Sequence, residues 1–93
     1  MDSEALAERL DSEFEGSEQV LRAVTRQARD LADSGRISEA LGYELTVDAV
    51  VSNLDDAPAE YTLVERWNWW IDSLELADGN YQRFRVRPGI ESG

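Results

Sequence analysis

The side chains that could do chemistry in this sequence are almost entirely carboxylates. The 93 residues include 20 Asp and Glu, 9 Arg, and no Lys, His or Cys. The chain therefore lacks the commonest general base, the thiol nucleophile and the usual ligands of zinc. Neighbouring carboxylates such as Glu13 and Glu15, or Asp55 and Asp56, could in principle transfer protons, but such pairs arise by chance where acids are this frequent. The sequence predicts neither an enzyme nor a bound cofactor or metal.

Charge reverses only near the C-terminus. Residues 1–78 carry 19 acids and 6 Arg, a net charge of -13, whereas residues 79–93 carry one acid and 3 Arg, a net charge of +2. Alternation predicts an extended Arg-rich arm over residues 81–88, with Gln82, Phe84 and Val86 on one side and Tyr81, Arg83, Arg85 and Arg87 on the other. Such an arm could bind phosphates and stack on bases. Three arginines on an acidic body, however, are weak evidence for nucleic-acid binding, and salt would lower the affinity for phosphates further. We expect the arm to dock on its own chain or on a neighbouring copy.

An aromatic block, Trp67-Asn68-Trp69-Trp70, supplies the second candidate. Successive helical residues are about 100° apart, so the three tryptophans cannot share one face. Trp67 and Trp70 fall on the apolar face of a predicted helix, and Trp69 falls away from it. Trp69 is then either a boundary aromatic or an interface anchor, since Trp is enriched at binding hot spots. The candidate interaction residues are therefore Trp69, Tyr81, Arg83, Arg85 and Arg87.

The elements that must position these residues are helices. Apolar residues recur at helical spacing, and Ser17 and Gly35 are suited to begin and end the strongest helix. The expected elements are a first helix over 3–14, a second over 17–34, a helical segment over 37–54 interrupted at Gly42, a Trp-rich helix over 59–77, and the arm. Residues 45–51 could instead form a strand, because β-branched residues are dense there. The prediction is a single all-α domain, a three- to four-helix bundle with a short extended C-terminal arm, whose core includes Leu21, Val47 and Leu74.

One segment resembles a helix-turn-helix motif. Ile37 to Gly42, followed by Thr46-Val47, is similar to its first helix, its turn and the start of its recognition helix. The turn is one residue short, and the second helix offers Asp48, Ser52 and Asn53 but no basic residue to meet DNA. A transcriptional regulator is therefore an alternative and not the leading interpretation.

The acid excess has three interpretations: a surface adapted to concentrated salt, a mimic of nucleic acid that binds a basic protein, and a coding bias toward Arg. The acids are spread evenly from Asp2 to Asp78, which favours the first, because a mimic would concentrate them in rows. The absence of Lys, the abundance of Asp, Glu, Ala and Val, and the Trp67–Trp70 block resemble the small, uncharacterised acidic proteins of haloarchaea. The resemblance implies a salty habitat and no particular activity.

The composition, the charge and the motifs together limit the functions that we expect. No apolar stretch approaches the roughly 20 residues that span a bilayer, so a cytoplasmic protein is expected. The leading hypothesis is a non-enzymatic interaction or oligomerisation module adapted to high salt, whose partner is a second copy or another protein. Nucleic acid and membrane are not expected partners.

Overall fold

The computed structural model describes residues 1–14 and 16–86, and over these residues it contains five α-helices, one 3₁₀ turn and no strand. The all-α prediction is confirmed. The elements are α1 (Ser3–Glu13), α2 (Glu18–Asp33), α3 (Arg36–Leu41), α4 (Val47–Asp55), α5 (Leu63–Asp78) and the 3₁₀ turn η1 (Gln82–Phe84).

Helix starts are set by side chains that accept hydrogen bonds from free backbone N–H groups. Ser17 Oγ accepts from Val20 N at 3.2 Å, and Thr46 Oγ1 accepts from Ala49 N at 3.1 Å. The Thr46 cap fixes residues 47–55 as helix and removes the strand alternative. Gly42, at φ 79°, ends α3 in the left-handed region that glycine adopts without strain. The predicted segment 37–54 is therefore two helices separated by a short loop.

The Trp-rich helix begins later than residue 59. Thr62 and Glu65 form a capping box, in which Thr62 Oγ1 accepts from Glu65 N and Glu65 Oε1 accepts from Thr62 N, at 3.3 and 2.9 Å. Residues 58–61 form a turn closed by the hydrogen bond from Tyr61 N to Pro58 O. Arg66 holds this connection, because its guanidinium donates to the backbone oxygens of Leu54, Ala59 and Tyr61 at 3.0–3.1 Å.

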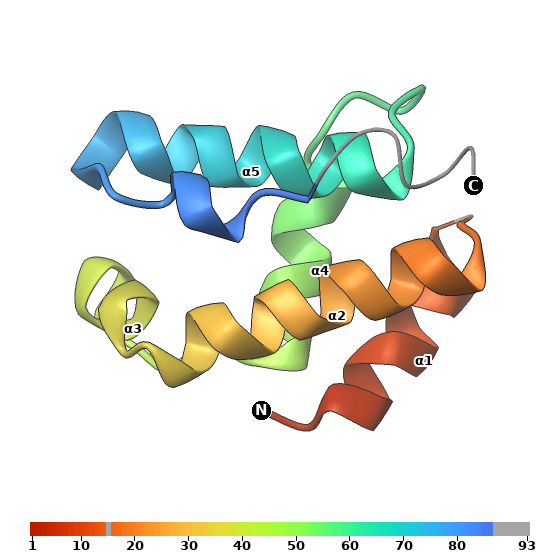
Figure 1. The fold of residues 1–93 in the computed structure, drawn as a ribbon, viewed down its shortest axis with the longest axis horizontal. Helices are drawn as coiled ribbons and strands as arrows, with labels where there is room; N and C mark the ends of the chain where they lie inside the picture. The colour runs from red at the N-terminus through yellow and green to blue at the C-terminus, as the bar shows by residue number, and fades with distance from the viewer. Residues whose placement is uncertain (15, 87–93) are drawn as a thin grey trace.

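The two long helices, α2 and α5, extend along the molecule's long axis, and α4 crosses between them (Figure 1). α1 packs against α2 and α4, α3 packs against α2, and η1 contacts both α2 and α5. The common core draws on every element. Its fully buried side chains include Leu6, Leu10, Val20, Val24, Leu31, Ile37, Val50, Leu54, Leu63, Trp67, Ile71 and Tyr81. Three residues expected in the core, Leu21, Val47 and Leu74, are only half-buried at its edge.

Candidate functional site

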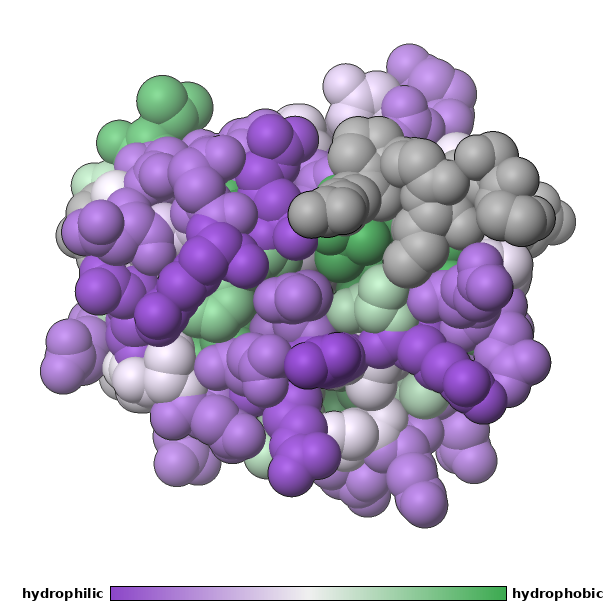
Figure 2. All heavy atoms as spheres, viewed as in Figure 1, coloured by the Kyte–Doolittle hydropathy of each residue, from purple (hydrophilic) through white to green (hydrophobic). Residues whose placement is uncertain are grey.

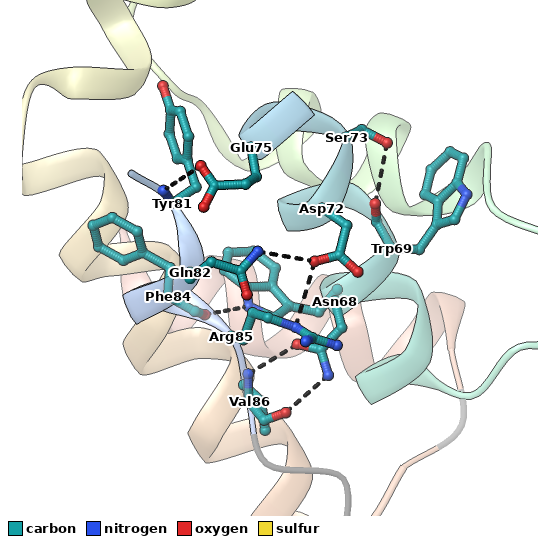
Figure 3. A network of polar contacts seen from close by, with 11 residues as sticks. Asn68, Trp69, Asp72, Ser73, Glu75, Tyr81, Gln82, Phe84, Arg85 and Val86 are labelled. Atoms are coloured by element: carbon teal, nitrogen blue, oxygen red, sulfur yellow. Dashed lines mark hydrogen bonds and ion pairs between the residues drawn. The ribbon is translucent and has the colours of Figure 1, made fainter. Parts of the chain in front are cut away.

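The chain reverses direction after α5 and returns along that helix. Gly79 and Asn80 both have positive φ, 78° and 67°, which turns the backbone back on itself. Residues 81–86, which we call the docked segment, then lie against α5 and α2 (Figure 3). The docked segment buries Tyr81, Phe84 and Val86, whereas Gln82, Arg83 and Arg85 are exposed. It therefore completes the core.

Two residues of the aromatic block, Trp67 and Asn68, hold the docked segment by its backbone, and Figure 3 shows the contacts of Asn68 with Val86. Trp67 Nε1 donates to Phe84 O at 2.7 Å. The Asn68 side chain contacts Val86 twice, accepting from Val86 N at 2.9 Å and donating to Val86 O at 2.8 Å. Asn68 is 6% exposed, so these bonds form away from water, where an unmade one would cost most. The side chain of Asn68 thus satisfies both polar groups of one residue, as a neighbouring strand would.

Charged groups line the exposed edge of the docked segment. Asp72 Oδ1 lies 3.5 Å from Arg85 Nε and accepts from Gln82 Nε2 at 3.3 Å. Arg83 lies over the ring of Phe84, 4.7 Å from its centroid. These arginines therefore contact their own chain, which is one of the two arrangements expected from the charge reversal. Arg87 lies outside the described residues.

The prediction of an extended arm over 81–88 is wrong for residues 82–84, which form the 3₁₀ turn η1. Hydrogen bonds from Phe84 N to Tyr81 O and from Arg85 N to Gln82 O close this turn. Three residues per turn bring Tyr81 and Phe84 to the same side, whereas strict alternation would separate them. Tyr81 is fully buried, so it belongs to the core and is not an exposed interaction residue. Arg85 follows in extended conformation, and residues 87–88 lie outside the described part.

Trp69 points away from the docked segment (Figure 3). It is half-buried, packs at the edge of the core, and borders a hollow of about 340 Å³ together with Tyr61, Val64 and Arg85. One and two turns further along α5 lie Ser73 and Leu76, on the same side of the helix. We call this side the outer face of α5. Its members are Glu65, Trp69, Asp72, Ser73 and Leu76.

Leu76 is the most exposed large apolar side chain of the described residues, at 90%. Figure 2 shows hydrophobic atoms projecting from a mainly hydrophilic surface at the C-terminal end of α5. The outer face therefore presents two apolar side chains, Trp69 and Leu76, seven residues and about 10 Å apart along the helix. Acidic Glu65 and Asp72 lie between and beside them.

Sequence reasoning identified Trp69 but missed Asn68, Asp72 and Leu76. A signal for Asn68 was present, since this amide directly follows Trp67, which was expected to face the core. Leu76 could have been found from its spacing of seven residues from Trp69, which places both on one side of any regular helix. Asp72 could not, because its partners Gln82 and Arg85 come from a turn that the alternation concealed.

The described residues also bear on metal binding, membrane insertion and DNA binding. Over the described residues, no three Asp or Glu side chains gather as they would to hold a metal ion. No helix in the same part of the chain is long and apolar enough to cross a membrane. α3 and α4 follow one another in the chain, as the two helices of a helix-turn-helix do, but α4 exposes Asp48 and Ser52, and Asn53 donates to Ala49 O of its own helix.

These features define a small all-helical domain that carries an amide-and-indole clamp on one side of its last helix. The chain belongs to the WNWW domain family, whose model matches residues 1–75. The tetrapeptide of that name stands at residues 67–70, and its first two members are the residues that hold the docked segment. The comparisons with curated proteins and with solved structures gave no match.

Proposed function

We propose that this WNWW domain is a non-enzymatic interaction module that self-associates through the outer face of α5 and is adapted to high salt. The observation that carries the proposal is the pair of outward apolar side chains, Trp69 and Leu76, on one side of the helix. Packing among the described residues does not account for Leu76, which is 90% exposed. Helix surfaces that enter a partner's groove are typically anchored by apolar residues at such spacings.

We expect the partner of this face to be a second copy of the chain, because concentrated salt screens the repulsion between two acidic faces. Two outer faces meeting about a two-fold axis would set Trp69 of each copy near Leu76 of the other. Glu65 and Asp72 both border Trp69, and Asp72 also borders Leu76. Both carboxylates are at least partly exposed, so the copies repel each other in dilute buffer. Salt screens that repulsion, because the Debye length falls to about 3 Å at 1 M. The apolar contact is not screened, so association should increase with salt.

The composition of the whole chain supports the same adaptation. The chain has a net charge of -11 and no Lys, and its acids are spread from Asp2 to Asp78. Self-repulsion at this charge density also opposes the compact monomer, and screening relieves it. We therefore expect the folded domain itself, and not only its self-association, to be more stable in molar KCl than in dilute buffer.

The test is size-exclusion chromatography with light scattering, in dilute buffer and in about 1 M KCl. The expected result is a dimer in KCl that the double variant Trp69→Ala/Leu76→Ala abolishes. Tyr43→Ala is the matched control, because Tyr43 is a large apolar side chain, 54% exposed, in the loop between α3 and α4. A monomer in both buffers, or a dimer that the double variant leaves intact, would contradict the proposal.

A further inference from the structure

The hollow beside Trp69 combines aromatic residues with carboxylates. It encloses about 340 Å³, which is near the lower limit of small-molecule pockets. Tyr61, just before α5, and Trp69, in its second turn, both line it and are half-buried. Val64 and Asn68 line it as well and are buried. The other lining residues carry charge, namely Glu65, Asp72 and Arg85.

The two aromatic residues of the hollow are open to a ligand. Over the described residues, each contact between an arginine and a ring, and each contact between two rings, involves other aromatic side chains. Figure 3 shows the Trp69 ring turned away from the docked segment. An aromatic face attracts a cation that comes within about 6 Å of the ring centre. Tyr61 and Trp69 therefore offer two such faces that the described part of the chain does not occupy.

The charge of the hollow is negative. Two carboxylates line it, those of Glu65 and Asp72, against one cation, Arg85. Arg85 Nε lies 3.5 Å from Asp72 Oδ1, so these two charges offset each other. Glu65 has no ion-pair partner among the described residues. The net charge of -11 adds to the repulsion of anions, so the hollow favours a cationic ligand.

The hydrogen bonds of the two carboxylates indicate which kind of cation fits. Glu65 Oε1 accepts from Thr62 N at 2.9 Å, and Asp72 Oδ1 accepts from Gln82 Nε2 at 3.3 Å. A primary ammonium or guanidinium group would need acceptors for three to five N–H donors. A quaternary ammonium group has no N–H donor and is covered by methyl groups, so it needs only apolar contact and a nearby negative charge. Aromatic residues bind such groups well.

A bare metal ion fits less well. Hard cations take oxygen ligands, and over the described residues no three Asp or Glu side chains gather to supply them. Tyr61 and Trp69 would add apolar surface to such a site without adding a carboxylate or carbonyl side chain.

We infer that the hollow beside Trp69 binds a quaternary ammonium group, whose methyl groups contact Tyr61 and Trp69 and whose charge is balanced by Glu65. The chain contains no Lys, so a second copy cannot supply trimethyllysine. The group belongs either to a free small ion or to a trimethyllysine side chain of another protein. The inference does not rest on self-association, although Trp69 belongs to both surfaces.

The experiment follows the backbone amide signals of the isotope-labelled full chain by NMR while choline is added in dilute buffer. Choline should shift amides within residues 61–72. Two compounds of the same length are compared with it: ethanolamine, which carries a primary ammonium, and the uncharged isostere in which a tert-butyl group replaces the trimethylammonium. We expect both to bind at least about two- to fivefold more weakly than choline, the range of an exposed cation–π contact.

Two variants test the aromatic and the acidic parts of the site separately. Trp69→Leu retains apolar contact and should weaken choline binding about two- to fivefold. Glu65→Gln removes the charge but preserves the capping box, because Gln also serves at that position, and it should weaken binding to a similar extent. Glu44→Gln is the matched control, since Glu44 is exposed and does not line the hollow. Circular dichroism checks that the variants remain helical.

The possible outcomes separate the inference from its rivals. Equal binding of choline and its uncharged isostere would show an apolar hollow only, and equal binding of choline and ethanolamine would show a general attraction of cations to an acidic surface. Either result, shifts confined to other helices, or no shift at all would overturn the inference. Equal weakening by Glu65→Gln and Glu44→Gln would overturn it too.

Two further measurements identify the source of the group and separate this site from self-association. Once choline binding is established, tighter binding of a short peptide that carries trimethyllysine would support a protein side chain as the source, and weaker binding would support a free ion. Leu76→Ala should bind choline normally, because Leu76 does not line the hollow. Failure of the self-association proposal is therefore distinguishable from failure of this one.

Discussion

Within the tetrapeptide at residues 67–70, the first two residues differ from the third in burial, in hydrogen bonding and in the direction of the side chain. Trp67 is fully buried, packs edge to face with Trp70 at 5.5 Å, and donates to Phe84 O. Asn68 is almost as buried and pairs with Val86. Trp69 is half-exposed and points away from both contacts (Figure 3). Residues next to each other on a helix face different surroundings, so one short block can serve both folding and association.

The comparison also shows how the family model relates to the fold. The match ends at residue 75, before the docked segment begins. Trp67 and Asn68 nevertheless bind that segment through its backbone oxygens and the Val86 N–H. Backbone groups are present whatever side chains the segment carries. The clamp therefore requires a segment that leaves a 3₁₀ turn at position 84 and buries the side chains at positions 84 and 86, and it imposes little else on the sequence of that segment.

The largest effect is expected at Trp67. Trp67→Ala would leave a cavity beneath α5 and remove the hydrogen bond to Phe84 O, lowering the free energy of unfolding by about 3–5 kcal/mol. Small domains have only about 5–10 kcal/mol in total, so the variant should be largely unfolded in dilute buffer. Urea denaturation followed by far-UV circular dichroism, in molar KCl, measures the loss.

Trp67→Phe separates packing from hydrogen bonding at the same position. It retains most of the buried aromatic surface but cannot donate to Phe84 O, so the expected loss is about 1–2 kcal/mol. If the two Trp67 variants were equally destabilised, the hydrogen bond and not the packing would dominate at this position.

The second effect is expected at Asn68. Asn68→Ala removes both bonds to Val86 and leaves the backbone groups of that residue without protein partners, a loss of about 2–3 kcal/mol. Amide hydrogen exchange gives a local readout, because the Val86 N–H should lose its protection before the amides of α2 do. Asn53→Ala is the matched control, since Asn53 donates only to Ala49 O within its own helix and is half-buried. If Asn53→Ala and Asn68→Ala lowered the free energy of unfolding equally, the hydrogen bonds from Asn68 to Val86 would contribute no more than one bond within a helix.

The sequence allowed the helices to be predicted because their boundaries are local. Helix ends depend on single residues, such as Ser17, Thr46, Gly35 and Gly42, that act within a few positions of themselves. A helical periodicity of 3.6 residues can likewise be recognised without knowing the fold. The docked segment was harder, because both a strand and a 3₁₀ turn agree with its pattern of apolar residues. Which of them forms depends on the surface of α5, because the backbone must place Phe84 O and Val86 N within hydrogen-bonding distance of Trp67 and Asn68. The Thr62–Glu65 capping box is present in the sequence, but the predicted helix over 59–77 begins four residues before Leu63, where α5 starts.

The smallest effect on stability is expected at Trp69, and this prediction sharpens the comparison most. Trp69→Ala removes a side chain that is already half in water, so the free energy of unfolding should fall by only about 1 kcal/mol, against about 3–5 kcal/mol for Trp67→Ala. Its effect should instead appear in the association state, because hot-spot tryptophans contribute most when a partner covers them. Urea denaturation at micromolar protein in dilute buffer, where we expect the monomer to prevail, measures the effect of Trp69→Ala on the free energy of unfolding of the monomer alone. If Trp69→Ala were as destabilising there as Trp67→Ala, Trp69 would be a core residue, and the distinction between Trp69 and the buried residues of the tetrapeptide would fail.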